Sequence, residues 1–109
     1  MHINIRASKI EMTPALEEFV GLKLQPLMRL LKQYENTGSA LLEIEFARTT
    51  THHKKGDVFY AEGMLKLPHG VLRAESTEND IHLAFQEMVK KLQGEIKKFK
   101  EKRSSKRRS

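Results

Sequence analysis

Hydrophobic residues in this chain follow two different spacings, and the order of these spacings limits what the chain can fold into. In four segments they alternate with polar residues, which is typical of half-buried strands. In two longer segments they recur every three or four residues, as on one face of an amphipathic helix. We therefore predict strands at residues 2–7, 42–46, 59–67 and 71–76, one helix that follows Thr13 and reaches about Leu31, and a second helix that begins near Thr77.

Local signals refine the two predicted helices. Thr13 is a favourable N-cap residue, and the proline after it suits the first helical position. Pro26 lacks the backbone donor that a continuing helix needs, so we expect a kink there, or a helix that breaks and restarts. Thr77, with Asp80 three residues later, predicts a capping box at the start of the second helix.

This order predicts an α+β fold of order β-α-β-β-β-α. The apolar faces of all six elements are satisfied if both helices pack on one face of a four-stranded sheet. The opposite, open face would be mainly acidic, because its residues would include Glu43, Glu45, Glu62, Arg73 and Glu75. Tyr60 is the only aromatic residue expected there. RNA should avoid this face, which argues against a sheet that stacks unpaired bases on exposed aromatic side chains.

The length of the chain suffices for one compact domain, since 39% of its 109 residues are hydrophobic. We expect residues 1–102 to form this domain and residues 103–109 to form a basic, flexible tail. The absence of cysteine excludes disulfides, thiolate nucleophiles and cysteine metal sites. No apolar run resembles a signal peptide or reaches the length of a membrane span, so we expect a soluble, cytoplasmic protein.

Positive charge is concentrated at the C-terminus. Residues 90–109 contain ten basic and two acidic residues, a net charge of +8, whereas residues 1–89 contain ten basic and twelve acidic residues, a net charge of −2. A dense array of cations displaces counterions from a polyanion. The partner could be nucleic acid, an anionic membrane surface or an acidic protein, and composition alone does not choose among them.

The basic residues fall on defined helical faces. An advance of about 100° per residue places four lysines of the second helix on two neighbouring ridges away from the apolar stripe, with members seven residues apart. Basic residues of the first helix also leave its apolar stripe, and together these cations can flank the groove between the helices. The candidate RNA-binding residues are Lys23, Arg29, Lys90, Lys91, Lys97, Lys98 and Lys100.

Catalytic and metal-binding chemistry finds little support in the sequence. The histidine pair His52 and His53, together with His69 and His82, fits no metal-ligand spacing. No serine, histidine and acid occur in the context of a nucleophile, and the glycines are too scattered for a phosphate-binding loop. We expect no enzyme, no metal and no cofactor.

Short motifs in both halves of the chain occur in a specific order. They are Leu72-Arg73-Ala74-Glu75, the run from Asn79 to Phe85, Lys91-Leu92, the run from Lys97 to Lys100, the run from Glu11 to Leu16, and Lys23-Leu24. In this order and spacing, over residues 1 to about 103, the chain resembles the family of ribosome hibernation promoting factors and ribosome-associated inhibitor A. It departs from the family at His82, where tyrosine is usual, and at Pro26 and Gly94, where basic residues are common.

The resemblance implies a non-catalytic translation inhibitor of the short form, active in the stress response. Such a protein would occupy the decoding channel of the small ribosomal subunit and exclude messenger and transfer RNA from idle ribosomes. The implied partner is ribosomal RNA of that subunit, with no small-molecule substrate and no membrane, and the protein would be a monomer off the ribosome. Lys23, Arg29, Lys91 and Lys98 match basic positions of the family, whereas Lys90, Lys97 and Lys100 rest mainly on the charge-face argument.

Two alternatives of other classes stay open at this point. Three strands followed by a helix also occur in general double-stranded-RNA-binding modules, and cation contacts to phosphate do not reveal which RNA is bound. The second helix could also lie on anionic lipid as a basic amphipathic helix, although its apolar stripe is better used to close the core.

Overall fold

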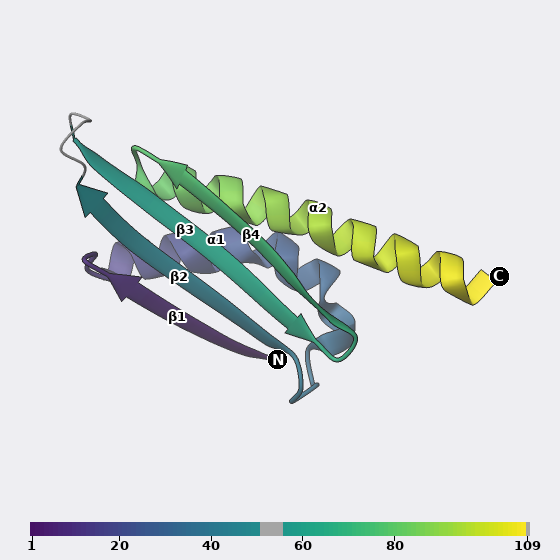
Figure 1. The fold of residues 1–109 in the computed structure, drawn as a ribbon. Coiled ribbons are helices and arrows are strands. Elements are labelled where there is room, and N and C mark those ends of the chain that lie inside the picture. The colour runs from purple at the N-terminus through teal and green to yellow at the C-terminus, as the bar shows by residue number, and fades with distance from the viewer. Residues whose placement is uncertain (51–55, 109) are drawn as a thin grey trace.

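The computed structural model describes residues 1–50 and 56–108 and has the predicted α+β fold (Figure 1). His52 and His53, which the sequence analysis considered as metal ligands, lie outside the described residues. In chain order the elements are β1 (His2–Ser8), α1 (Pro14–Leu30), the short 3-10 helix η1 (Lys32–Tyr34), β2 (Leu41–Thr50), β3 (Asp57–Leu67), β4 (Gly70–Glu78) and α2 (Ile81–Arg108).

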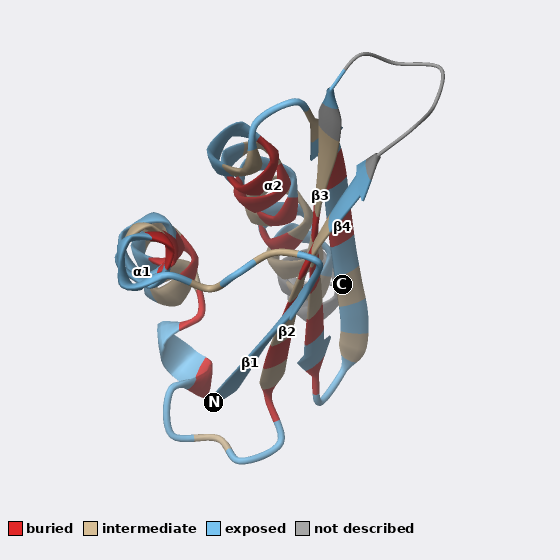
Figure 2. Cartoon of the chain, turned by 90° about the vertical axis from the view of Figure 1, so that its left-hand side faces the viewer, coloured by how far each residue is buried: buried red, intermediate tan, exposed pale blue. Residues whose placement is uncertain are grey.

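The four strands form one sheet in the order β1-β2-β3-β4. β1 pairs with β2 in parallel, because α1 returns the chain to the end of the sheet where β1 began. The other neighbours are antiparallel. Both helices lie on the same face of the sheet (Figure 2), so the molecule has a helical layer on one side and an open sheet face on the other.

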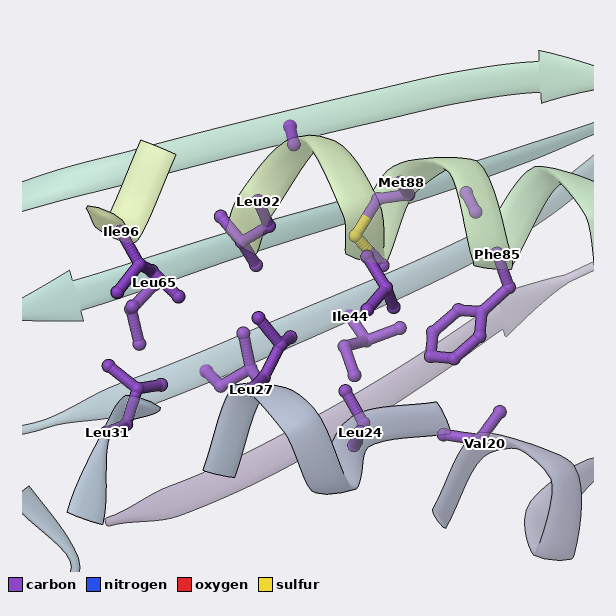
Figure 3. Packing of buried hydrophobic residues seen from close by; sticks show 14 of the residues in the cluster. Val20, Leu24, Leu27, Leu31, Ile44, Leu65, Phe85, Met88, Leu92 and Ile96 are labelled. Carbon is purple, nitrogen blue, oxygen red and sulfur yellow. The ribbon is translucent and has the colours of Figure 1, made fainter. Parts of the chain in front are cut away.

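The core lies between the sheet and the two helices (Figure 3). Apolar residues of α2 recur at helical spacing, so they lie on one face of the helix. This face packs against the sheet, and its residues are fully buried. α1 and β2 contribute in the same way. The buried stripes consist of Phe85, Met88, Leu92 and Ile96 from α2, Val20, Leu24 and Leu27 from α1, Leu31 just after it, and Leu42, Ile44 and Phe46 from β2.

β1 is less buried than its alternating pattern predicts. Ile3 and Ile5 lie beside Leu42 and Ile44 in the register, on the helical side of the sheet as expected. They nevertheless stay 41% and 40% exposed, because β1 is an edge strand with no neighbour on its outer side.

The start of α1 is confirmed and that of α2 is corrected. The Thr13 hydroxyl accepts a hydrogen bond from the backbone amide of Leu16 at 3.1 Å. The predicted capping box is wrong, because Thr77 lies in β4, where this β-branched residue continues the pairing with β3. Asp80 alone accepts from the backbone of His82, at 2.9 Å, and α2 begins at Ile81.

α1 ends at Leu30, close to the predicted end, whereas α2 is longer than predicted. α1 does not break at Pro26, which removes one backbone hydrogen bond, while the buried residues Leu24 and Leu27 hold both halves of the helix on the same core. α2 passes through Gly94 and continues to Arg108, so residues 103–108 of the segment predicted as a tail extend the helix. The long helix therefore carries most of the basic C-terminal segment on one straight support.

Candidate nucleic-acid interface

Several charged residues of the open sheet face are paired with one another. Arg73 donates to the carboxylates of Glu62 and Glu75 at 2.9 and 2.8 Å, and Lys66 lies 2.9 Å from Glu43. The Tyr60 hydroxyl lies within hydrogen-bond distance of the same two carboxylates, at 2.6 Å from Glu75, and its single proton is shared between them. Among the described residues, this face therefore offers no aromatic ring free of polar partners, and its cations Arg73 and Lys66 are neutralised.

The protonation states of this network follow from its geometry. The hydrogen bond from Arg73 is the main cause that lowers the pKa of Glu62, and the bond from Tyr60 acts in the same direction. Partial burial is the main cause that raises the pKa of Tyr60, followed by its bonds to Glu62 and Glu75. Glu62 thus stays ionised and Tyr60 stays a neutral donor, which stabilises the arrangement at neutral pH.

The helical layer carries the opposite charge. Lys90 and Lys97 are exposed on the outward ridge of α2, about 10 Å apart along a rigid axis. Among the residues that the structure describes, no carboxylate lies within ion-pair distance of these two lysines or of Lys23 and Arg29. Cations without acidic partners are available to an external polyanion.

The groove between the two helices brings together one predicted residue from each. A hollow of about 330 Å³ there is lined by Lys23 and Pro26 of α1 and by Gln86, Val89, Lys90 and Gln93 of α2. Lys23 and Lys90 thus flank this groove, as the sequence predicted. The two glutamines were not among the predicted residues, although their positions beside Lys90 on the helix could have indicated them.

Lys91 and Lys98 lie on the other side of α2, toward β4, and the expectation that they flank the groove is wrong. The Nζ of Lys91 donates to the backbone carbonyl oxygen of Glu75 at 3.0 Å. Lys98 follows on the same ridge, 4.0 Å from Glu95. These two lysines form a second cationic line along the edge of the sheet.

Arg29 and Lys100 occupy the far end of the helical layer. Arg29 lies in the last turn of α1, where the helix dipole favours a cation. It also lines a shallow hollow together with Lys32. The half-buried Lys100 donates through Nζ to the carbonyl oxygen of Leu30, at the end of α1. Lys100 therefore ties α2 to α1 in addition to contributing charge.

An aromatic cluster holds Lys23 in place. Its Nζ lies 5.7 Å from the centre of the Phe19 ring, within the range of a cation–π interaction. Phe19 in turn meets the rings of His82 and Phe85 edge-on, at 4.5 and 6.2 Å. The histidine thus still supplies a ring at a position where tyrosine is usual. Phe19 was not predicted as part of the site, but its position one helical turn before Lys23 could have indicated the contact.

The described part of the chain shows no cluster of three or more potential metal ligands. What the helical layer provides is a surface of separate cations on two rigid helices. A family model described as Sigma 54 modulation protein / S30EA ribosomal protein matches residues 3–104. The chain belongs to this family. It is therefore a ribosome-associated modulation factor, a class that acts in ribosome hibernation and translation regulation.

Solved structures with the same fold support the architecture. The N-terminal domain of Protein Y from Thermus thermophilus is 24% identical, with a TM-score of 0.69, and the alignment covers 91% of this chain and 99% of that one. A ribosomal subunit interface protein from Coxiella burnetii is 20% identical, with a TM-score of 0.68 and coverage of 92% and 98%. At these identities the likeness concerns the fold.

Proposed function

We propose that this protein binds the small ribosomal subunit through its helical layer and occupies the decoding channel. There it would exclude messenger and transfer RNA from idle ribosomes. The observation that carries the proposal is the contrast between the two faces. Lys23, Arg29, Lys90 and Lys97 are exposed without acidic partners among the described residues, whereas Arg73 and Lys66 on the open face are neutralised by neighbouring carboxylates.

The proposed mechanism is occlusion without a chemical step. Lysines on a packed helix keep their spacing when they meet phosphates, so little conformational freedom of the backbone is lost on binding. Each phosphate they neutralise releases counterions, which drives association and makes it dependent on salt. The protein needs no cofactor in this mechanism, and its place of action would be the cytoplasm, as a monomer until it meets the ribosome.

The lipid-surface alternative is disfavoured by the packing of α2. Its apolar stripe, which includes Phe85, Met88 and Leu92, is fully buried against the sheet. A helix that lies on a membrane needs that stripe to face lipid. Within the described residues, no helix has the length and hydropathy required to span a membrane.

Co-sedimentation with purified ribosomal subunits at increasing salt tests the proposal. We expect binding to small subunits in preference to large ones, with the logarithm of the affinity falling by about 0.7 to 0.9 per displaced counterion for each unit of log salt. Prior binding of messenger RNA and transfer RNA to the small subunit should compete with the protein. Equal binding in the presence and absence of these RNAs would contradict occupation of the decoding channel.

A further inference from the structure

A second hollow lies at the end of the helical layer, where η1, the end of β3 and α2 meet. Figure 1 shows these segments converging beside the turn between β3 and β4. The hollow has a volume of about 170 Å³ and is partly open to solvent. It is lined by Leu31, Gln33, Tyr34, Leu67, Ile96, Phe99, Lys100 and Arg103.

The buried side chains that line this hollow are apolar apart from the Tyr34 hydroxyl, and its volume is about that of one aromatic ring. Leu31, Leu67 and Ile96 are buried core residues that end at its floor, and Tyr34 is also buried. An engineered apolar cavity of about 150 Å³ binds benzene, so a space of this volume can accept a single flat ring.

The ring of Phe99 forms one wall of the hollow, and Gly70, beside the turn between β3 and β4, leaves room for it. A Cβ atom placed on Gly70 would lie 3.2 Å from Cε2 of Phe99, closer than ordinary contact. The missing side chain at Gly70 thus lets the ring lie against the turn. The guanidinium carbon of Arg103 lies 5.9 Å from the ring centre, in cation–π range.

The mouth of the hollow is basic and polar. Lys100 and Arg103 stand at it without any carboxylate among the lining residues, and the Gln33 amide adds a donor and an acceptor. The bond from Lys100 to the Leu30 carbonyl fixes this part of the mouth. An apolar interior with an unneutralised cationic mouth complements a ligand that has a flat ring attached to an anion.

We propose that this hollow, the η1–α2 pocket, receives one unpaired nucleobase of the bound RNA, with an adjoining phosphate on Arg103. The inference rests on the proposed function and deepens it, because it assigns the surface a contact that phosphate attraction does not provide. Bases stack on aromatic side chains irrespective of sequence, and an amide can bond to a base edge. The pocket and the candidate RNA-binding lysines both belong to the helical layer, so one RNA strand can contact both.

An RNA hairpin with a single bulged uridine, compared with the same hairpin with an abasic site at the bulge, tests the proposal. We expect the base to increase affinity about tenfold in fluorescence anisotropy, within the range found for stacking on one aromatic residue. Arg103→Gln should weaken binding of both hairpins by a similar factor. Arg6→Gln, which removes one cation from β1 on the opposite face, is the matched control and should leave both affinities unchanged.

Gln33→Phe separates the pocket from general electrostatics. Gln33 is exposed on η1, so a phenylalanine there can fill the mouth without entering the core. We expect the tenfold preference for the bulged base to vanish while affinity for the abasic hairpin is unchanged. Asn36→Phe, at an exposed position outside the pocket lining, should keep the preference.

The tyrosines provide a direct readout of occupancy. The chain has two tyrosines and no tryptophan, so Tyr60→Phe leaves Tyr34 as its only tyrosine, at the pocket wall. Binding of the bulged hairpin should quench Tyr34 fluorescence, and the abasic hairpin should not.

Equal affinity of the wild-type protein for the two hairpins would overturn the pocket but leave the proposed function intact, provided that the protein still co-sediments with small subunits. If Gln33→Phe lowers co-sedimentation while the hairpins bind equally, the pocket takes an apolar side chain of a protein instead, and the base proposal is wrong. Loss of co-sedimentation in the wild-type protein would contradict the proposed function itself.

Discussion

The side chain of Lys91 donates to the backbone carbonyl oxygen of Glu75 at 3.0 Å, which links the helical layer to the edge strand β4. The carboxylate of the same Glu75 accepts from Arg73 and Tyr60 on the open face. One residue thus belongs to both faces of the molecule. Because a lysine covers this edge of the sheet, β4 is less available than β1 for pairing with another strand.

Replacing Lys91 or Lys98 by glutamine should affect the stability of the protein differently but weaken RNA binding to a similar extent. Lys91→Gln removes the bond to β4 and should lower the free energy of unfolding by about 0.5 to 1.5 kcal/mol. Lys98→Gln should change it by less than about 0.5 kcal/mol, because the lysine is 72% exposed and its approach to Glu95 is long. Urea denaturation measures the first quantity, and co-sedimentation with small subunits should show a similar loss of affinity for both variants. Equal stability of the two variants would argue against a structural role for Lys91.

The outward ridge of α2 should control how binding depends on salt. Replacing both Lys90 and Lys97 by glutamine removes two unpaired cations at little cost in helix propensity. We expect weaker binding to small subunits and a log–log salt slope that is smaller in magnitude by about 1.4 to 1.8. Arg6→Gln with Lys9→Gln removes the same charge from the β1 side and serves as the control. If both double variants changed the slope equally, the protein would bind through net charge and not through its helical layer.

The sequence was sufficient for the architecture because the core depends on short-range patterns. Alternation in the strands and the stripe from Phe85 to Ile96 are both local, and one sheet with both helices on one face buries them together. Thr77 misled the prediction because a threonine suits both an N-cap and a strand, and the pairing with Tyr60 decided the outcome.

The site could be predicted only in part, because it depends on contacts between distant residues. The angle of about 100° per residue separates the ridge of Lys90 from that of Lys91. It does not indicate which ridge borders α1 and which borders β4. The bond from Lys100 to Leu30 joins residues separated by 70 positions, and no local pattern indicates it. The η1–α2 pocket likewise combines three separate segments of the chain.

Gly63 should be intolerant of a side chain, in contrast to Gly94. A Cβ atom on Gly63 would lie 2.7 Å from Sδ of Met88 and 3.2 Å from Cδ2 of Leu92, both buried in the core, so α2 packs tightly on β3 at this point. Gly63→Ala should lower the free energy of unfolding by about 1 to 3 kcal/mol. Gly94→Ala meets no atom within 4 Å and should raise it by about 0.5 to 1 kcal/mol, because alanine is a better helix former. Thermal denaturation followed by circular dichroism compares the two, and a stabilising Gly63→Ala would show that the helix can move away from the sheet.

The network around Glu62 should make stability depend on pH without affecting ribosome binding. The folded protein lowers the pKa of Glu62, so its contribution is present above the unfolded value of about 4.3 and is lost as the pH falls through the lower folded pKa. The folded protein raises the pKa of Tyr60, so that contribution is present below the unfolded value of about 10 and declines as the pH rises beyond it. Glu62→Gln should therefore be less stable than wild type at pH 7, and the difference should shrink in acid.

Urea denaturation of wild type and Glu62→Gln between pH 3 and pH 7 measures this difference. Glu45→Gln is the matched control, because Glu45 lies opposite Glu62 in the register but outside the Tyr60–Arg73 network. A constant difference between wild type and Glu62→Gln across this range would contradict the role assigned to Arg73. Both variants should co-sediment with small subunits as wild type does, because the network lies on the face turned away from the helices, where its carboxylates would repel phosphate. A salt-dependent gain of binding in either variant would instead place RNA on the open sheet face, because each variant removes a carboxylate that repels phosphate.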